Sequence, residues 1–468
     1  METKLNYKRT FLIGLAFLSI CSFWQMYDNI IPLILQNTYH LGETMTGAVM
    51  ALDNVLAIFL LPVFGTLSDK VHTKLGRRMP FIVSGTILAV IFMMLLPMID
   101  NAEKARWGTV ESFSNQVIFL AVLFFTLVSM GLYRSPAVAL MPDVTPNHLR
   151  SRANAVINLM GAVGGVYALI MIKVLVGKGE TPDYLPLFAS IAAVMAIAVG
   201  ILVMTIRENK LREEVEKAEA AIAETIEEKA MAEGVEAVGE IEAVGDTGAV
   251  KASDGKKQTG KTEGTKGMPK EVKRSMYFML ASIFLWFTAY NAVTTAFSRY
   301  TKVVWKMEGG SFANCLMVAT VAAILSYIPI GNISAKIGRK KTIMGGVLLM
   351  AACYGGAIFA REYHPIINVA FALIGVAWAA INVNSYPMIV AMSSGSDVGK
   401  FTGTYYTFSM AAQIRLSGFL LENVSYNTLF PYALFFSLMA FLTMTQVRHG
   451  DVKPQKKESI LENFDVDD

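Results

Sequence analysis

Charged residues are scarce in this sequence. Asp, Glu, Lys and Arg together make up 17% of its 468 residues, whereas a soluble domain carries about a quarter. Hydrophobic residues make up 54%, and the mean hydropathy is +0.46. This composition argues against a soluble protein and indicates an integral membrane protein.

Cysteine is also rare, and catalytic motifs are missing. Cys21, Cys315 and Cys353 all lie inside apolar stretches, where a cysteine usually serves as a small buried hydrophobe, and no metal-ligand spacing links them. Gly76 is followed by two arginines rather than by the Gly-Lys-Ser/Thr ending of a phosphate loop. We therefore expect no enzymatic activity, no cofactor, no metal and no nucleic-acid partner.

Long apolar runs dominate the rest of the chain. Each is about 20 residues long, which is the length that a helix needs to cross about 30 Å of hydrocarbon. The first run exceeds the apolar core of a signal peptide and has no small-residue cleavage site after it, so we interpret it as a retained membrane helix. The expected spans are 11–36, 45–67, 80–99, 117–141, 153–176, 185–206, 277–303, 312–334, 342–360, 365–392, 401–421 and 429–446.

A polar segment divides these twelve spans into two sets of six. Residues 233–270 are rich in Gly, acidic residues and Lys, and they contain no aromatic residue, so they cannot bury a core. The segment is either a simple tether or a regulatory element. The predicted organisation is an N-terminal six-helix half (1–206), a flexible or partly helical cytoplasmic linker (207–275), a C-terminal six-helix half (276–446) and a cytoplasmic tail (447–468).

Positive charge sets the expected orientation. Lys and Arg gather in the loops after spans two, four and eight, and the positive-inside rule places such loops in the cytoplasm. An even number of spans then places both termini there too. We expect a monomer that crosses the lipid bilayer of the plasma membrane many times.

One loop motif occurs in both halves. The segment 65–78 carries Gly, Asp and four cations between two apolar runs, and a weaker copy occupies 331–341 at the equivalent place. Spans four and ten also share a proline five residues before a methionine, at Pro136 and Pro387. These echoes indicate that the chain consists of two related halves.

The motif resembles that of the major facilitator superfamily. The family's loop pattern, Gly-x-x-x-Asp-(Arg/Lys)-x-Gly-(Arg/Lys)-(Arg/Lys), is met by Gly65, Asp69, Lys70, Gly76, Arg77 and Arg78, with four extra residues before Gly76. That longer form, together with segments 135–143 and 385–387, resembles the sucrose transporters and the glycoside-pentoside-hexuronide cation symporters. The resemblance implies an all-α membrane fold of twelve transmembrane helices in two pseudo-symmetric halves, which works by alternating access.

Three departures from that group bear on solute and ion choice. The arginine that the group carries in span four falls at Val138, although Arg134 lies one turn earlier on the same helix face. The paired Asp residues of sodium-coupled melibiose-type carriers would fall near Ala57 and Leu61, so that sodium site is missing. Span eleven contains Arg415, where relatives have an apolar, proline-containing turn.

Four charged residues inside the expected spans are candidates for a functional role: Asp28, Asp53, Arg134 and Arg415. A charge at bilayer depth costs about 2.5–3.5 kcal/mol, so it needs a partner or a water-filled cavity. Asp28 and Asp53 lie at a similar depth on neighbouring helices, where two carboxylates can share a proton. We expect these two, with Arg134 as their partner, to couple transport to protons; a structural ion pair is the alternative.

Polar and aromatic side chains on the first helix of each half suit a sugar. Trp24, Gln25 and Asp28 fall on one face of span one, beside Asn29. A sugar offers hydroxyl groups to hydrogen-bond and ring faces to stack on aromatics. Each amide alone is more often a contact between helices than a ligand contact. The remaining solute-binding candidates are Asn158, Trp286, Tyr290, Asn291, Thr294, Asn382 and Asn384.

The basic loop has a predicted mechanical role. Asp69 can accept hydrogen bonds from the next helix N-terminus or from an arginine in the other half, while Arg77 and Arg78 pair with acids at other helix ends. Such a latch, with Gly65 and Gly76 at the places that the family pattern expects, would stabilise the outward-facing state and break when the protein opens inward. The alternative is that the positive charge only sets topology.

These patterns predict a proton-coupled symporter of a sugar, either a disaccharide or a glycoside. One alternative is a carrier of a non-sugar solute or an efflux substrate. Another is a membrane sensor that transports nothing. The expected partners are a small solute and protons.

Overall fold

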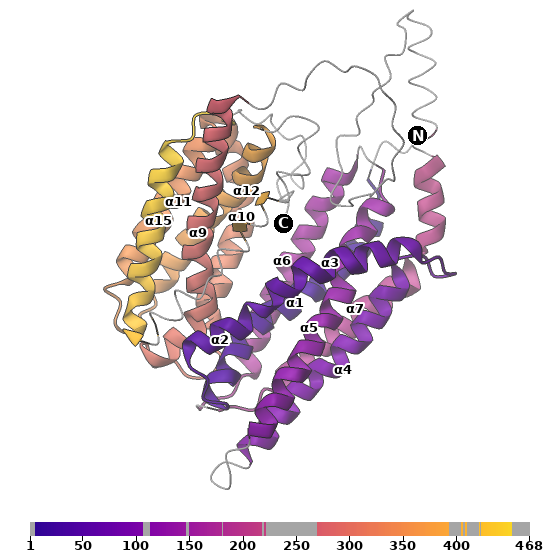
Figure 1. The fold of residues 1–468 in the computed structure, drawn as a ribbon, viewed down its shortest axis with the longest axis horizontal. Coiled ribbons are helices and arrows are strands. Elements are labelled where there is room, and N and C mark those ends of the chain that lie inside the picture. Colours follow the sequence, from indigo (N-terminus) through magenta and orange to yellow (C-terminus); the bar gives the residue numbers. More distant parts are fainter. Residues whose placement is uncertain are drawn as a thin grey trace, which may run out of the picture.

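The chain forms long helices that run roughly side by side (Figure 1). The structure is a computed structural model that describes residues 5–105, 113–146, 149–179, 181–217, 220, 269–392, 404–405, 408–409, 421 and 423–451. Ten helices of the described residues are long and apolar enough to cross a membrane. The helices are α1 (Tyr7–Asn37), α2 (Glu43–Met50), α3 (Leu52–Lys70), α4 (Met79–Lys104), α5 (Phe113–Asp143), α6 (Arg150–Leu175), α7 (Leu185–Thr205), α9 (Lys270–Val303), α10 (Ala313–Ile337), α11 (Arg339–Ala357), α12 (Ile367–Val390), the short 3-10 helix η3 (Tyr426–Thr428) and α15 (Leu429–Thr445).

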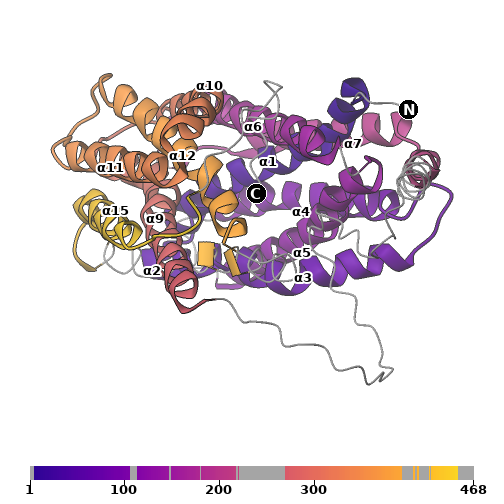
Figure 2. The ribbon, with the colours of Figure 1, turned by 90° about the horizontal axis from the view of Figure 1, so that it is seen from above.

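Two bundles lie side by side, α1 to α7 in one and α9 to α15 in the other (Figures 1 and 2). Their internal packing repeats: α1 packs on α7, α4 on α5 and α7, and α3 on α5, just as α9 packs on α15, α11 on α12 and α15, and α10 on α12. The same neighbours at the same places in both bundles confirm the expected all-α fold of two related sets of helices. Most of the expected linker, the eleventh span with Arg415, and the tail beyond 451 lie outside the described residues.

The second expected span is a single apolar stretch over Glu43–Lys70 whose helix is interrupted at one residue. The sequence predicts one helix over 45–67, but α2 ends at Met50 and α3 begins at Leu52, with Ala51 between them. Asp53 consequently lies in the first turn of α3, where unpaired backbone N–H groups favour a negative charge. An apolar pattern does not reveal such a break, because the chain remains hydrophobic on both sides of it.

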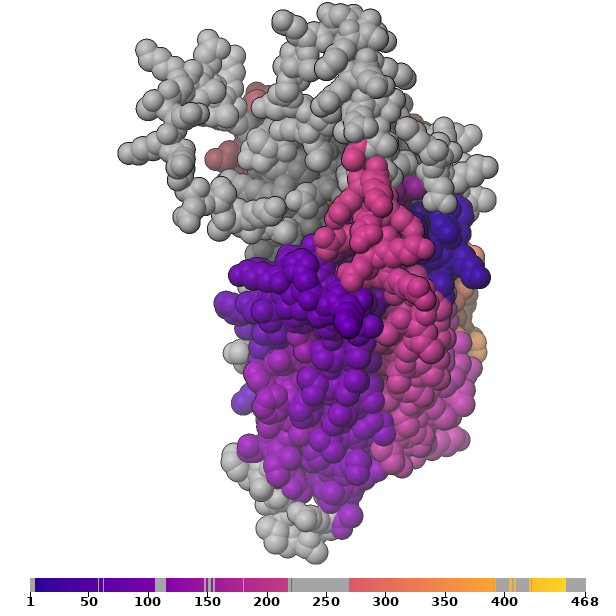
Figure 3. All heavy atoms as spheres, turned by 90° about the vertical axis from the view of Figure 1, so that its right-hand side faces the viewer, coloured from indigo at the N-terminus to yellow at the C-terminus, as the bar shows by residue number. Residues whose placement is uncertain are grey.

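The two ends of the molecule differ. At the linker end, where α7 finishes and α9 starts, helix ends of each bundle are joined by charged side chains. Glu208 accepts hydrogen bonds from the backbone N–H groups of Arg77, Arg78 and Met79 at the start of α4, at 2.9 to 3.0 Å. The segment that carries Glu208, helical over 208–217, sits on this end of the first bundle (Figure 3, pink).

The second bundle repeats this cap. Asp451 accepts a hydrogen bond of 3.0 Å from the backbone N–H of Lys340 at the start of α11. In both bundles, therefore, an acid just after the last membrane helix satisfies the free N–H groups of the helix that follows the basic loop. Glu208 falls in the predicted linker and Asp451 in the predicted tail, where the sequence pattern indicates no role for either.

At the opposite, far end the two bundles touch. α6 packs against α10, and α1 against α9. The loop before α10 comes so close to the end of α6 that a Cβ on Gly310 would lie 2.0 Å from the carbonyl oxygen of Ile172, and Gly309 has a positive φ of 58°. Only glycine fits such an approach, so this loop fixes the distance between the bundles at the far end.

Candidate functional site

A cavity of about 490 Å³ lies between the two bundles. Its walls come from α1, α2, α3 and α6 of the first bundle and from α9, α10 and α12 of the second. Its volume falls within the range of about 300–1,000 Å³ that is typical of small-molecule sites. Ten of the residues singled out in the sequence line it: Trp24, Gln25, Asp28, Asn29, Asp53, Asn158, Tyr290, Asn291, Thr294 and Cys21.

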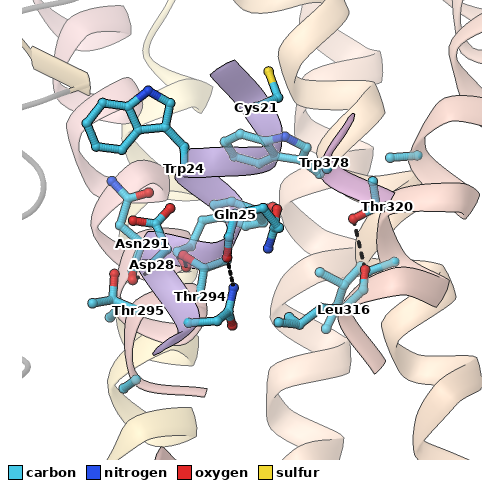
Figure 4. Close-up of a pocket in the computed structure, with 18 of the residues that line it drawn as sticks. Cys21, Trp24, Gln25, Asp28, Asn291, Thr294, Thr295, Leu316, Thr320 and Trp378 are labelled. Atoms are coloured by element: carbon cyan, nitrogen blue, oxygen red, sulfur yellow. Dashed lines mark hydrogen bonds between the residues drawn. The ribbon is translucent and has the colours of Figure 1, made fainter. Parts of the chain in front are cut away.

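The polar face of α1 forms one wall. Trp24, Gln25 and Asp28 project from it toward Asn291 and Thr294 of α9 (Figure 4). The Asp28 side chain is exposed to the cavity, whereas Asn29 is 2% exposed. The Trp24 Nε1 and the Asn29 Oδ1 are buried with no hydrogen-bond partner among the described residues. A solute with both donor and acceptor groups would satisfy these atoms.

Aromatic rings form a second feature. The rings of Tyr290 and Trp378 stack with centroids 3.8 Å apart and planes 8° apart, and Phe287 meets Trp378 edge-on at 5.3 Å. Trp378 lines the cavity from α12, opposite Trp24 (Figure 4). Trp378 is not among the predicted solute contacts. The sequence does indicate Trp378, because it lies one helical turn before Asn382, a predicted solute contact, and therefore shares a helix face with it.

The candidate coupling charges lie in one region. Asp28 and Asp53 both line the cavity, and they are close enough for the charge of Asp53 to act on Asp28 and that of Arg134 to act on Asp53. The Arg134 guanidinium also lies over the Trp24 ring, 5.8 Å from its centroid, which is cation–π distance. Arg134 itself is not among the lining residues. Two carboxylates and one cation are thus held together by α1, α3 and α5.

Three predicted solute contacts, Trp286, Asn382 and Asn384, do not line this cavity. Trp286 is fully buried and does not line the cavity, although Tyr290 one turn later does. Asn384 donates to the carbonyl of Ala380 at 2.9 Å and accepts from Ser334 of α10, so it joins two helices of one bundle. Asn382 also lies away from the cavity. A helix presents only part of its surface to a cavity, and packing inside the bundle takes the rest.

A buried ion pair crosses between the bundles at the far end of the cavity. The Nη2 of Arg299, on α9, lies 2.9 Å from the Oε2 of Glu43, on α2, and the side chains are 5% and 4% exposed. Tyr426 donates a hydrogen bond to the other oxygen of Glu43. Neither residue is among the predicted functional residues. Arg299 falls inside the seventh expected span, so it belonged with the charges at bilayer depth.

The basic loop makes its contacts within the first bundle. Arg77 and Arg78 donate to Asp143 at the end of α5, at 2.6 to 3.1 Å, and Asp69 pairs with Arg78 at 2.5 Å. Pairing of these arginines with an acid at another helix end agrees with the expected latch. The expected partner of Asp69 in the other half is not seen among the described residues, and Glu208, not Asp69, holds the next helix N-terminus.

The Arg77 guanidinium has a shifted pKa. Burial lowers the pKa of Arg77, but the hydrogen bond to Asp143 and the charges of Asp143, Asp69 and Glu208 outweigh it and raise the pKa above its ordinary value. Arg77 therefore keeps its charge at any physiological pH. Among the glycines of the loop, Gly76 has a positive φ of 122°, as a tight turn requires. Within the described residues, no group of His, Cys, Asp or Glu side chains could hold a metal ion.

Two bundles of apolar helices long enough to cross a membrane, with a polar and aromatic cavity between them, are typical of a multi-pass membrane transporter. The family model of the Major Facilitator Superfamily matches residues 12–414 and 305–463. The chain belongs to this family.

Curated relatives are similar over a limited stretch. Sucrose transport protein SUT3 of Oryza sativa subsp. japonica is 26% identical over 137 residues, which is 28% of this chain and 27% of that protein. Sucrose transport protein SUC4 of Arabidopsis thaliana is 34% identical over 116 residues, 23% of this chain and 22% of that protein. The matched stretch thus spans about a quarter of these relatives.

Solved structures are similar over nearly the whole chain. The inward open conformation of the xylose transporter XylE from E. coli has a TM-score of 0.63 at 13% identity and covers 98% of both chains. The nucleoside transporter NupG has a TM-score of 0.62 at 13% identity, covering 94% of this chain and all of that one. At such identities the likeness concerns the fold alone.

Proposed function

We propose that this protein is a proton-coupled sugar symporter that works by alternating access. One observation carries the proposal: two carboxylates, Asp28 and Asp53, line the same cavity as the aromatic rings of Trp24, Tyr290 and Trp378. The carboxylates supply a site for a proton, and the rings supply apolar faces for a solute. The sucrose transport proteins among the curated relatives support a sugar as that solute.

Solute recognition would use both bundles. Trp24 and Gln25 come from α1, while Tyr290, Asn291 and Thr294 come from α9 and Trp378 from α12. Aromatic faces stack on the C–H faces of a sugar ring, and amide and hydroxyl groups bind its hydroxyls. A disaccharide or a glycoside, with two ring units, would contact both walls at once and so would favour their approach.

Proton coupling would arise from the crowded charges. Two negative carboxylates near one another in a cavity of low polarity favour the state in which one carries a proton. Arg134 stabilises the remaining negative charge on Asp53. Binding and release of that proton would change the charge of Asp28, which faces the solute. The affinity for the sugar would therefore depend on whether the proton is bound.

The described contacts support a conformation that is closed at the far end. There the bundles are held by the Glu43–Arg299 pair and by the glycine loop before α10. At the linker end, the ion pairs among the described residues lie within the first bundle and do not join the two bundles. Transport would require the far-end contacts to break while new ones form at the linker end.

The linker end faces the cytoplasm in this proposal, because the basic loops lie there and positive charge favours the cytoplasmic side. Both termini would then be cytoplasmic, and the protein would act as a monomer in the plasma membrane. The predicted boundaries at 206/207, 275/276 and 446/447 remain part of the proposal.

The test is uptake of labelled sucrose and glycosides into proteoliposomes under an imposed inward proton gradient. Accumulation above the equilibrium level that a proton uncoupler abolishes is the expected result. Sugar that only equilibrates, with or without the uncoupler, would exclude proton coupling. Movement of a non-sugar solute, outward pumping, or no transport at all would favour the alternatives of another cargo, efflux or a sensor.

A further inference from the structure

The first turns of α9 carry an exposed face outside the cavity described above. Its residues recur at helical spacing, i, i+3, i+4, i+7, i+8 and i+11, so they share one side of the helix. They line a surface groove of about 400 Å³ and are Lys270, Lys273, Arg274, Tyr277, Phe278 and Ala281.

The three cations of this groove have no acidic partner among the described residues, although Glu271 lies in the same turn. All three side chains belong to exposed residues. The Arg274 guanidinium lies over the Phe278 ring, 5.7 Å from its centroid. Other cations at the same end are engaged: Arg77 and Arg78 with Asp143, and Lys340 with the carbonyl of Thr445. The three cations of the groove are therefore available to bind an anion.

The order of residues along the helix matches the layers of a membrane surface. The cations come first, the aromatic rings of Tyr277 and Phe278 follow one to two turns later, and Ala281 opens the apolar part of α9. Tyr277 is 60% exposed. Aromatic side chains concentrate at the level of lipid headgroups, with apolar residues deeper and cations at the water side.

We propose that this face binds an anionic phospholipid. Lys270, Lys273 and Arg274 would hold the phosphate and any second negative charge of the headgroup, because cations beside an anionic membrane surface attract its lipids. Tyr277 would lie at the glycerol level, and the acyl chain would run along Phe278 and Ala281. A free phosphate ion would use only the cations, whereas a lipid uses the whole stripe, and the apolar part of the groove favours the lipid.

The experiment measures binding of fluorescent phosphatidylglycerol to the purified full-length chain in micelles of an uncharged detergent. Saturable binding is expected, about fivefold weaker for each cation removed. The Lys270→Gln/Lys273→Gln variant should therefore bind more weakly, whereas Lys270→Arg/Lys273→Arg should bind as the original chain does. Fluorescent phosphatidylcholine should bind weakly to all variants.

A matched control removes two other exposed cations at the same end. Lys336→Gln/Lys341→Gln lowers the net charge equally but leaves the groove intact, so its lipid affinity should be unchanged. Equal weakening by both double variants would show diffuse attraction and overturn the proposal. Complete displacement of the lipid by inorganic phosphate would indicate a soluble anion instead.

Two further outcomes concern other occupants of the face. Phe278→Ala should weaken lipid binding while leaving inorganic phosphate binding as it was; no effect on the lipid would contradict the role of the apolar stripe. A loss of thermal stability of Lys270→Gln/Lys273→Gln in lipid-free detergent would mean that the cations bind an acidic part of the chain itself, and the proposal would be wrong. None of these results depends on which solute the cavity accepts.

Discussion

Arg299 lies 2.9 Å from Glu43, although the two residues belong to different bundles and are separated by more than half of the chain. Both side chains are about 95% buried. The Nε and Nη1 atoms of Arg299 are buried without a hydrogen-bond partner in the part of the chain that the structure describes, so the hydrogen-bonding capacity of the pair is only partly used there. A buried charge pair of this kind stabilises a state mainly because each charge would be costly there alone.

Removing one charge of this pair should open the far end. With Glu43→Gln, Arg299 is left buried and unpaired, which costs about 3–5 kcal/mol in the closed state. A cysteine placed at Met50, in a background that lacks the native cysteines, should then react faster with a membrane-impermeant thiol reagent. The charge exchange Glu43→Arg/Arg299→Glu should restore slow labelling in part. Unchanged labelling of the Glu43→Gln protein would exclude this pair as a gate.

Neutralising the cavity carboxylates should separate binding from accumulation. In Asp28→Asn and Asp53→Asn the proton has lost its site, while an amide of the same shape still fits the cavity. We expect exchange of internal for external sugar to persist and uphill accumulation to fall at least tenfold in one or both variants. The measurement is proteoliposome uptake with and without an imposed pH difference. If both variants concentrate sugar as the original protein does, the proton travels by another route.

The stacked pair of Tyr290 and Trp378 should govern solute affinity. Trp378→Leu removes a ring that lines the cavity, and loss of one aromatic contact of about 0.5–1.5 kcal/mol together with its buried area should raise the KM for sugar roughly tenfold. Asn382→Ala, one turn further along α12 and away from the cavity, is the control and should leave KM unchanged. Similar KM changes in the two variants would show that the ring acts through the packing of α12, not through contact with the solute.

The caps at the linker end should contribute to stability. Glu208→Gln replaces a carboxylate that accepts from three backbone N–H groups by an amide that accepts less well, and such a charged hydrogen-bonding group contributes about 1.5–3 kcal/mol. We expect a lower melting temperature in detergent for Glu208→Gln. Asp451→Asn, at the equivalent position of the second bundle, should act in the same direction.

The control for these caps is Glu213→Gln. Glu213 is exposed and lies on the same helical segment as Glu208, so its substitution should leave the melting temperature as it is. A drop for Glu213→Gln equal to that for Glu208→Gln would mean that the net charge of the segment, rather than the cap, stabilises the first bundle.

The sequence by itself determined the helices and their repetition. Inside a bilayer every backbone N–H and C=O must be paired within its own segment, so an apolar run of about 20 residues has little choice but to form a helix. The two basic loops and the polar segment at 207–275 predict where the two halves divide, because charged and polar residues are costly in hydrocarbon. Asp28 and Asp53 could be selected because a charge at that depth is costly wherever the helix happens to point.

Only the tertiary structure decided which side chains meet. Lipid does not force one apolar face of a helix inward, because lipid tails are as apolar as the side chains, so helix rotation follows from packing between helices. That packing turned Trp378 into the cavity and Trp286 into the core, and it brought Glu43 to Arg299 across more than half of the chain. Distances of this kind depend on the folding of both bundles together, and no spacing within the sequence records them.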